Sequence, residues 1–374
     1  SGSGTLLLGT GKVVSCQQYD WTSGRIIVGG GSFSASDLYD PHIAGTFTLS
    51  GGAINLAQDG GHSVDINADI SISGGTFTIS GGSRCNLAAS RSVNFTMSGG
   101  VLELGTRGMV YESGCYALTS NLYGGTIRTA GSLLITRGGF VMTGGTVEPF
   151  GGLNSSVIVN APSRIHQLNV AKSPSNTVYI NGNTVVGGNA TITTGRLEIQ
   201  DCTLGIAGNL TITGTLAMNS VADIVNVEGS VIWSSASTCD IVSGTLAIKG
   251  NMNVNSSTSF TMGDASILKF YGTSPSALST GLSTLTLGNI LVQKTGSSCT
   301  MDPTGMIKLF YANDVAVYGG STFNPYNNAM IVEGKIDIWE GGCLTVNNNA
   351  EISAYNFYCS GLYNQSNGLV YVNN

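Results

Sequence analysis

The strongest candidate for chemistry in this sequence is a polar run, Asp59-Gly-Gly-His-Ser-Val-Asp-Ile-Asn-Ala-Asp69. If residues 63–69 form a strand whose apolar side chains face inward, Asp65, Asn67 and Asp69 share the outer face, because side chains alternate along a strand. Carboxylate and amide oxygens in a row are ligands that suit Ca²⁺. The run is therefore a candidate calcium site, but we favour the simpler interpretation of a solvated strand face whose acidic residues discourage aggregation.

A second candidate lies among the aromatic residues, 11 of which follow residue 300. In Lys335-Ile-Asp-Ile-Trp-Glu340, the same alternation places Trp339 beside Lys335 and Asp337 on one face, an arrangement suited to a sugar ring. Exposed tyrosine and tryptophan are also favoured in contacts between subunits. We expect a ligand-binding or interface role for four aromatic residues, with core packing or a cap as the alternative: Trp339, Tyr355, Tyr358 and Tyr363.

The eight cysteines contain no CxxC pair, so the metal and redox motifs built on that spacing are absent. An even number of cysteines permits disulfide bonds in an extracellular protein, whereas unpaired cysteine also packs well in an apolar interior. The pair we expect is Cys343 with Cys359. Their separation of 16 residues is close to one repeat, which would bring them to neighbouring strands about 4.8 Å apart.

Motifs of catalysis are scarce in this chain. The 21 acidic residues are spread along 374 positions, and the three histidines stand apart. Neither G-x-S-x-G nor HExxH is present. Carboxylates on adjacent strands can still meet at roughly 5–10 Å. A polysaccharide lyase or hydrolase, or a tail-spike-like enzyme, is therefore the alternative to a non-enzymatic protein.

The elements that must position these residues follow from a repeated phrase of alternating apolar residues around Gly-Gly. A repeat of this length is one rung of a stack, and a rung buries its apolar face only against its neighbours. Glycine at a fixed place in each rung is expected where the chain turns a corner with positive φ. We predict an all-β fold, a right-handed parallel β-helix (β-solenoid) with rungs of about 20–25 residues. The first glycines are separated by 23, 25, 25 and 20 residues: Gly51, Gly74, Gly99, Gly124 and Gly144.

Local composition divides the predicted solenoid into four segments. Residues 1–45 are irregular and suit an N-terminal cap, and residues 46–150 carry the Gly-Gly rungs. Residues 151–300 continue the solenoid with single glycines, and residues 301–374 form aromatic-rich C-terminal rungs and a cap. Three of the seven prolines fall within residues 148–176, which predicts a kink, an insertion or a join between two solenoid stretches there, because proline interrupts a strand ladder.

The composition narrows the classes of partner. Charged residues make up 10% of the chain, against roughly 25% in an average soluble protein. No cluster of Lys and Arg can neutralise a run of phosphates, so a nucleic-acid partner is not expected. No run reaches the roughly 18 apolar residues of a membrane helix, so no membrane span is expected. A neutral surface rich in Ser, Thr and Asn suits a protein that works outside the cell or packs against its own copies.

Residues 165–199, Ile165-His-Gln-Leu-Asn-Val-Ala-Lys through Gly195-Arg-Leu-Glu-Ile199, follow the pattern L-x-V-x-K … V-x-I-x-G-x-x-x-V-x-G-N-x-T-I-x-x-G-x-L. This segment resembles rungs of secreted bacterial surface proteins, the large adhesin-like exported repeat proteins of Bacteroidetes and related phyla. Leu287-Gly-Asn-Ile-Leu-Val-Gln-Lys-Thr295 repeats its opening. The resemblance implies a β-solenoid and export to the cell surface.

These observations lead to one expected function and two alternatives. We expect a non-enzymatic extracellular structural protein, a surface fibre or adhesin subunit that associates with itself, end to end. No cofactor is expected beyond the candidate Ca²⁺. The alternatives are a carbohydrate-active β-helix and a glycan-binding module that uses Trp339.

Overall fold

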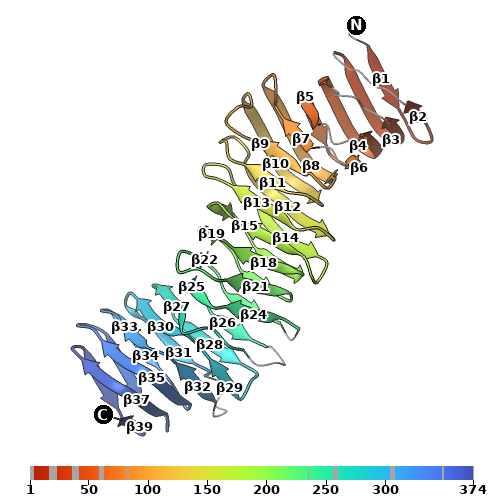
Figure 1. Ribbon diagram of the computed structural model, residues 1–374. Helices are drawn as coiled ribbons and strands as arrows, with labels where there is room; N and C mark the ends of the chain where they lie inside the picture. Colours follow the sequence, from red (N-terminus) through yellow and green to blue (C-terminus); the bar gives the residue numbers. More distant parts are fainter. Residues whose placement is uncertain are drawn as a thin grey trace. The chain divides into compact units, whose positions relative to one another are not determined.

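The computed structural model describes residues 4–16, 23–35, 42–58, 63–81, 84–234, 236–255, 260–303, 308–347 and 349–373. Within these ranges the regular secondary structure consists of β-strands alone, β1 to β39. The chain forms two compact units, Ser1–Gly188 and Asn189–Asn374. Parallel strands stack into rungs of about 21 residues, which confirms the predicted parallel β-solenoid (Figure 1).

In the first unit, inward-facing side chains at the same position of successive rungs lie above one another. Phe77 pairs with Leu102, Leu102 with Ile127, and Ile127 with Val147, and all four are buried. Apolar columns of this kind form the core. The strands are β1 (Thr5–Leu8), β2 (Val13–Cys16), β3 (Arg25–Ala35), β4 (His42–Gln58), β5 (Ser63–Ile72), β6 (Thr76–Gly81), β7 (Arg84–Leu87), β8 (Val93–Leu104), β9 (Met109–Tyr111), β10 (Leu118–Thr129), β11 (Leu133–Ile135), β12 (Met142–Gly151), β13 (Ser155–Val159), β14 (Gln167–Lys172), β15 (Thr177–Ile180) and β16 (Thr184–Val186).

The five Gly-Gly pairs of the repeated phrase lie where their rungs turn a corner. A left-handed backbone there is cheap only for glycine, because glycine has no Cβ. Space is also short, since a Cβ on Gly145 would lie 2.5 Å from the carbonyl oxygen of Gly125. The repeated glycines therefore mark the close approach of one rung to the next. The second glycine of every pair has φ between +71° and +78°: Gly52, Gly75, Gly100, Gly125 and Gly145.

The ladder extends into residues 1–45, where the sequence predicted an irregular cap. Strands β1 and β2 both pair with β3, and β3 pairs along its length with β4. Regular rungs therefore begin before residue 46, where the sequence pattern placed the first Gly-Gly rung. Residues 17–22 and 36–41 of this segment lie outside the described residues.

Parallel pairing also continues through residues 148–176. Strand β12 pairs with β14 and β11 pairs with β13. Pro149 lies within β12, and Pro162 follows a cis peptide bond in the connection after β13. The prolines are thus accommodated within paired rungs, and the kink remains a prediction.

Rungs of the second unit are built from up to three strands, one on each of three ladders. One ladder passes through β19, β22, β25, β27, β30, β33, β35 and β37, and we call it the third ladder. The strands are β17 (Ala190–Thr194), β18 (Arg196–Ile199), β19 (Thr203–Ile206), β20 (Leu210–Ile212), β21 (Thr215–Met218), β22 (Ile224–Val227), β23 (Val231–Trp233), β24 (Thr238–Ile241), β25 (Ser243–Ile248), β26 (Met252–Val254), β27 (Ala265–Gly272), β28 (Ser276–Thr280), β29 (Thr284–Thr286), β30 (Asn289–Lys294), β31 (Ser297–Met301), β32 (Leu309–Ala312), β33 (Val315–Val317), β34 (Ser321–Asn324), β35 (Ala329–Ile338), β36 (Cys343–Val346), β37 (Glu351–Cys359), β38 (Leu362–Gln365) and β39 (Leu369–Val372).

A column of short polar side chains ties the rungs of the second unit together. Asn189 Oδ1 accepts the backbone N–H of Asn209 at 2.8 Å, and Asn209 Oδ1 accepts that of Ser230 at 2.8 Å. The Ser230 hydroxyl accepts the N–H of Asn251 at 3.0 Å, and Asn251 Oδ1 accepts that of Ala277 at 2.9 Å. Each side chain therefore satisfies a backbone donor of the following rung.

A charged column does the same on the outer surface of the first unit. Arg128 donates through Nη1 to Glu103 Oε2 and through Nε to Glu148 Oε1, both at 2.8 Å. Asn169 Nδ2 extends the column to a fourth rung by donating to Glu148 Oε2 at 3.0 Å. Alternating charge on successive rungs favours the native register, because opposite charges face each other across the ladder.

Candidate functional site

The outer face of the third ladder carries an open groove of about 270 Å³. Alternation sets its lining: in β33 the side chains of Val315 and Val317 are buried, so that of Ala316 points outward. Ala316 and Leu291, which pair in the ladder, form the floor. An aromatic column of Tyr318 and Trp339 lines one side. A polar column lines the other with Asn289, Asp314 and Lys335.

The aromatic column is a stacked pair. The rings of Tyr318 and Trp339 lie one rung apart, with centroids 5.4 Å apart and planes at 7°. This spacing fits the roughly 4.8 Å between neighbouring strands. Trp339 is nevertheless 50% exposed. Cys359 is the ladder neighbour of Ile338, so the small Ser360 follows Trp339 in the column and leaves the indole accessible.

The polar column holds its groups in place through neighbouring rungs. Asp314 Oδ1 accepts the backbone N–H of Lys335 at 2.8 Å, and Asn289 Oδ1 accepts a hydrogen bond from Asn313 at 3.0 Å. The Lys335 ammonium lies 3.6 Å from Asp337 Oδ2. The predicted placement of Trp339 with Lys335 and Asp337 on one face agrees with this geometry. The site thus combines an aromatic surface with fixed hydrogen-bonding groups.

The other predicted aromatic residues do not all join this site. Tyr358 is the ladder neighbour of Asp337, and it continues the outer face beyond the groove. Tyr355 is also exposed, but it lies where β37 turns between its two pairings with β35. Tyr363 lies in β38 on a different ladder, where its ring packs edge-on against Phe357 at 5.6 Å.

Tyr318 is a residue of the candidate site that the sequence pattern alone did not pair with Trp339. The two residues are separated by one 21-residue rung, so the repeat length itself was the signal. Asn289 and Asp314 likewise emerge only when residues of successive rungs are aligned by the ladder register.

The predicted row of Asp65, Asn67 and Asp69 in β5 is not a single outward face. Asn67 is 3% exposed, and its Oδ1 accepts the backbone N–H of Ser90 at 2.6 Å. Its predicted outward placement is wrong because β5 turns a corner there, pairing with β7 before the turn and with β8 after it.

The two carboxylates of that row contact the next rung. Asp65 Oδ1 accepts a hydrogen bond from Asn86 at 2.8 Å. Asp69 Oδ1 accepts the N–H of Asn94 at 2.8 Å and lies 3.5 Å from Arg91 Nη2. These contacts favour a rung-joining role over the candidate calcium site. Across the described ranges, no three His, Cys, Asp or Glu residues are grouped as metal ligands would be, and both Asp59 and His62 lie outside those ranges.

All eight cysteines fall within the described ranges, and none forms a disulfide. The expected Cys343–Cys359 bond is not formed. The ladder partner of Cys343 is Leu362, and the ladder partner of Cys359 is Ile338. The two cysteines lie on different ladders. Burial raises the pKa of the thiols of Cys85, Cys239 and Cys299 to about 12, so these groups are poor nucleophiles at neutral pH.

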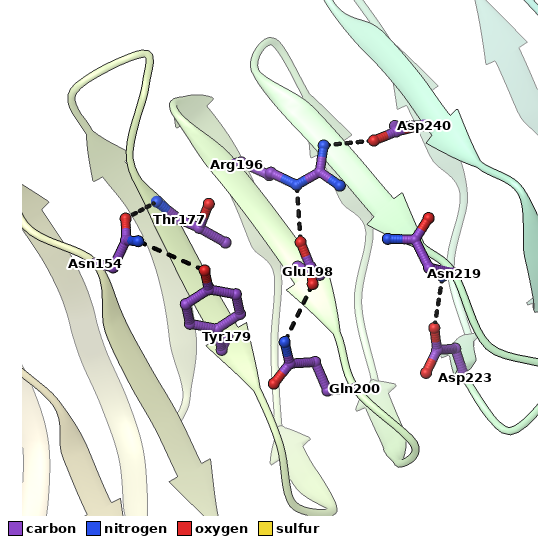
Figure 2. A network of polar contacts seen from close by, with 9 residues as sticks. All are labelled: Asn154, Thr177, Tyr179, Arg196, Glu198, Gln200, Asn219, Asp223 and Asp240. Carbon is purple, nitrogen blue, oxygen red and sulfur yellow. Dashed lines mark hydrogen bonds and ion pairs between the residues drawn. The ribbon is translucent and has the colours of Figure 1, made fainter.

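A second polar cluster in the second unit is an ion-pair network around Arg196 (Figure 2). The Arg196 guanidinium donates to Glu198 in its own strand and to Asp240 two rungs further along. Glu198 also accepts a hydrogen bond from Gln200 at 3.1 Å. Both carboxylates are thus committed to the guanidinium, which is typical of an ion pair that joins rungs.

Asp223 has a similar structural role. It is fully buried, and its carboxylate accepts the backbone N–H groups of Asp201, Asn219 and Ser220 at 2.7–2.9 Å. Figure 2 shows the contact with Asn219. The donors of Asn219 and Ser220 close the turn between β21 and β22, and that of Asp201 joins the carboxylate to the preceding rung. The groove on the third ladder is therefore the better candidate for binding.

Comparisons with known proteins leave the family of this chain open. In the part of the chain that the structure describes, no helix has the length and apolar character needed to cross a membrane. The chain matches no family model, and no curated protein or solved structure is significantly similar to it.

Proposed function

We propose that this chain is a non-enzymatic extracellular structural protein, a surface fibre or adhesin subunit whose copies associate end to end. The observation that supports it is the way one rung holds the next. Backbone ladders, the Asn189–Asn251 column and the Glu103–Arg128–Glu148 column all join residues about one rung apart. A rung is therefore a template that a rung of another copy can extend by the same bonds.

The surface composition supports an extracellular location. Few charges and many Ser, Thr and Asn side chains give a surface that bonds to neighbours without strong repulsion between copies. The resemblance of residues 165–199 to exported adhesin-like repeats points to the same compartment.

Electron microscopy of the purified chain across a concentration series tests the proposal. We expect filaments with a regular axial repeat that lengthen as concentration rises. Single particles of constant size at every concentration, checked by light scattering, would contradict self-association.

A proline variant sharpens this test at the edge of β39. The N–H of Leu369 donates to the carbonyl of Ala350, just before β37, and that of Asn373 donates to the carbonyl of Ala354 within β37. The N–H of Val372 therefore points to the opposite side of the strand. Val372→Pro removes that outward donor without breaking the internal ladder. We expect Val372→Pro to shorten the filaments, whereas Val372→Thr, which keeps the N–H, should assemble like the parent chain.

A further inference from the structure

We propose that the groove on the third ladder binds a linear, uncharged glycan, a role separate from whether copies of the chain associate. A sugar ring has a C–H face that stacks on aromatic rings and a rim of hydroxyl groups that hydrogen-bond. The groove offers both kinds of surface on opposite sides, with the Tyr318–Trp339 pair facing Asn289, Asp314 and Lys335. Between them lie Leu291 and Ala316, and Asp337 continues their column.

The aromatic side supplies the contact area. Trp339 leaves half of its surface in solvent although it is stacked on one side. Burial of exposed aromatic surface against a ligand is favourable because it removes apolar area from water. The indole and phenol also carry polar groups that tolerate the wet surroundings of a sugar. The stacked pair is thus a preformed platform whose rotamers are already restricted, which lowers the entropic cost of binding.

The charges in the groove select an uncharged ligand. Lys335 is paired with Asp337 at 3.6 Å, which leaves the Asp314 carboxylate without a cationic side chain among the groove residues. The local charge is therefore negative. Uronic acids, sulfated sugars and nucleic-acid phosphates would meet repulsion there, because no surplus of Lys or Arg neutralises them.

The same columns continue along the ladder, which favours a chain over a single sugar. A second depression of about 200 Å³ is lined by Asn226, Glu228, Ala247, Lys269 and Tyr271. Ladder register places Tyr271 beside Gln293, in the column that leads to Tyr318 and Trp339. The Tyr271 hydroxyl donates to Glu228 Oε1 at 2.9 Å, so this ring too is held in place. Two aromatic contact points on one column fit a ligand with a regular repeat along the solenoid.

Titration calorimetry of the full chain with uncharged hexasaccharides tests this inference. We would use cellohexaose, xylohexaose and mannohexaose, with an oligogalacturonate of the same length as the charged comparison. We expect at least one uncharged hexasaccharide to bind and the oligogalacturonate to bind at least tenfold more weakly. Failure of all three uncharged probes, or tighter binding of the oligogalacturonate, would overturn the proposal.

Two variants locate the site. Trp339→Ala should weaken binding by tenfold or more, and Tyr355→Ala, which removes an equally exposed aromatic ring of the next rung that does not line the groove, should not. Equal affinity of Trp339→Ala and the parent chain would overturn the assignment. Circular dichroism shows whether each variant is folded. Light scattering of the same samples reports association separately, so loss of binding and loss of assembly can be told apart.

Discussion

At the scale of single residues, the motif that carries the family resemblance contains a buried cation. Lys172 is 1% exposed, and its Nζ donates to the carbonyl oxygens of Ala130 at 2.9 Å and Phe150 at 2.8 Å. Lys294, at the equivalent place in the second copy of the motif, is fully buried and donates to the carbonyl of Lys249. In L-x-V-x-K, strand alternation places the lysine inward with the Leu and Val. The buried position of this lysine was therefore predictable from the pattern, although the pattern was used only as evidence of a resemblance.

Burial lowers the pKa of Lys172 to about 8, from 10.5 in an exposed lysine. Between these pH values the unfolded chain binds more protons than the folded chain, so the contribution of this group to stability rises with pH. We expect the parent chain to gain stability relative to Lys172→Met as pH rises. The unfolding free energy of the parent chain minus that of the variant should increase from pH 7.5 to pH 10 by on the order of 1–3 kcal/mol. Urea unfolding at a series of pH values measures it.

The control for this experiment is Lys12→Met, which removes an exposed lysine of the same unit. Its stability curve should run parallel to that of the parent chain over the same pH range. A parallel curve for Lys172→Met as well would show that the buried ammonium keeps its ordinary pKa.

At the scale of the element, the corner of each rung was predictable and the ends of the regular array were not. Gly-Gly at nearly constant spacing indicated the turn, and positive φ at Gly145 confirms it. Alternation failed at Asn67, because the strand turns there and side chains on both sides of the turn point inward. The first rungs were missed because their glycines, Gly29, Gly30 and Gly31, form a triplet that departs from the repeated phrase.

Two glycines of β12 allow the cost of backbone strain to be measured separately from the cost of crowding between rungs. Both have positive φ, +78° at Gly145 and +83° at Gly151, but a Cβ on Gly151 meets nothing within 4 Å. Gly151→Ala should therefore cost only the left-handed strain of about 1–2 kcal/mol. Gly145→Ala adds a clash with the Gly125 carbonyl and should cost about 2–5 kcal/mol in total. Chemical unfolding of both variants measures the difference, and equal costs would mean that rung spacing relaxes freely.

At the scale of the whole molecule, the repeat period was enough to predict the class of fold, because each rung contacts mainly its sequence neighbours. The candidate groove on the third ladder could not be predicted in the same way. Its aromatic side combines residues of two rungs and its polar side those of three, so it depends on a register that a period of about 21 residues only approximates. Ladder shifts of one residue, such as those between β8 and β10, decide which side chains meet.

Near-neighbour contacts also predict how damage spreads through the molecule. Stability in a stacked repeat is roughly a sum of rung and interface contributions, so a local defect should remain local. In Gly145→Ala we expect faster amide hydrogen exchange in β10, β12 and β14, which pair at or next to the altered corner. Strands β25, β27 and β30 of the second unit should exchange as in the parent chain. Hydrogen exchange measured by mass spectrometry shows whether the defect stays local. An equal increase in exchange in both units would mean that the solenoid unfolds as one cooperative body.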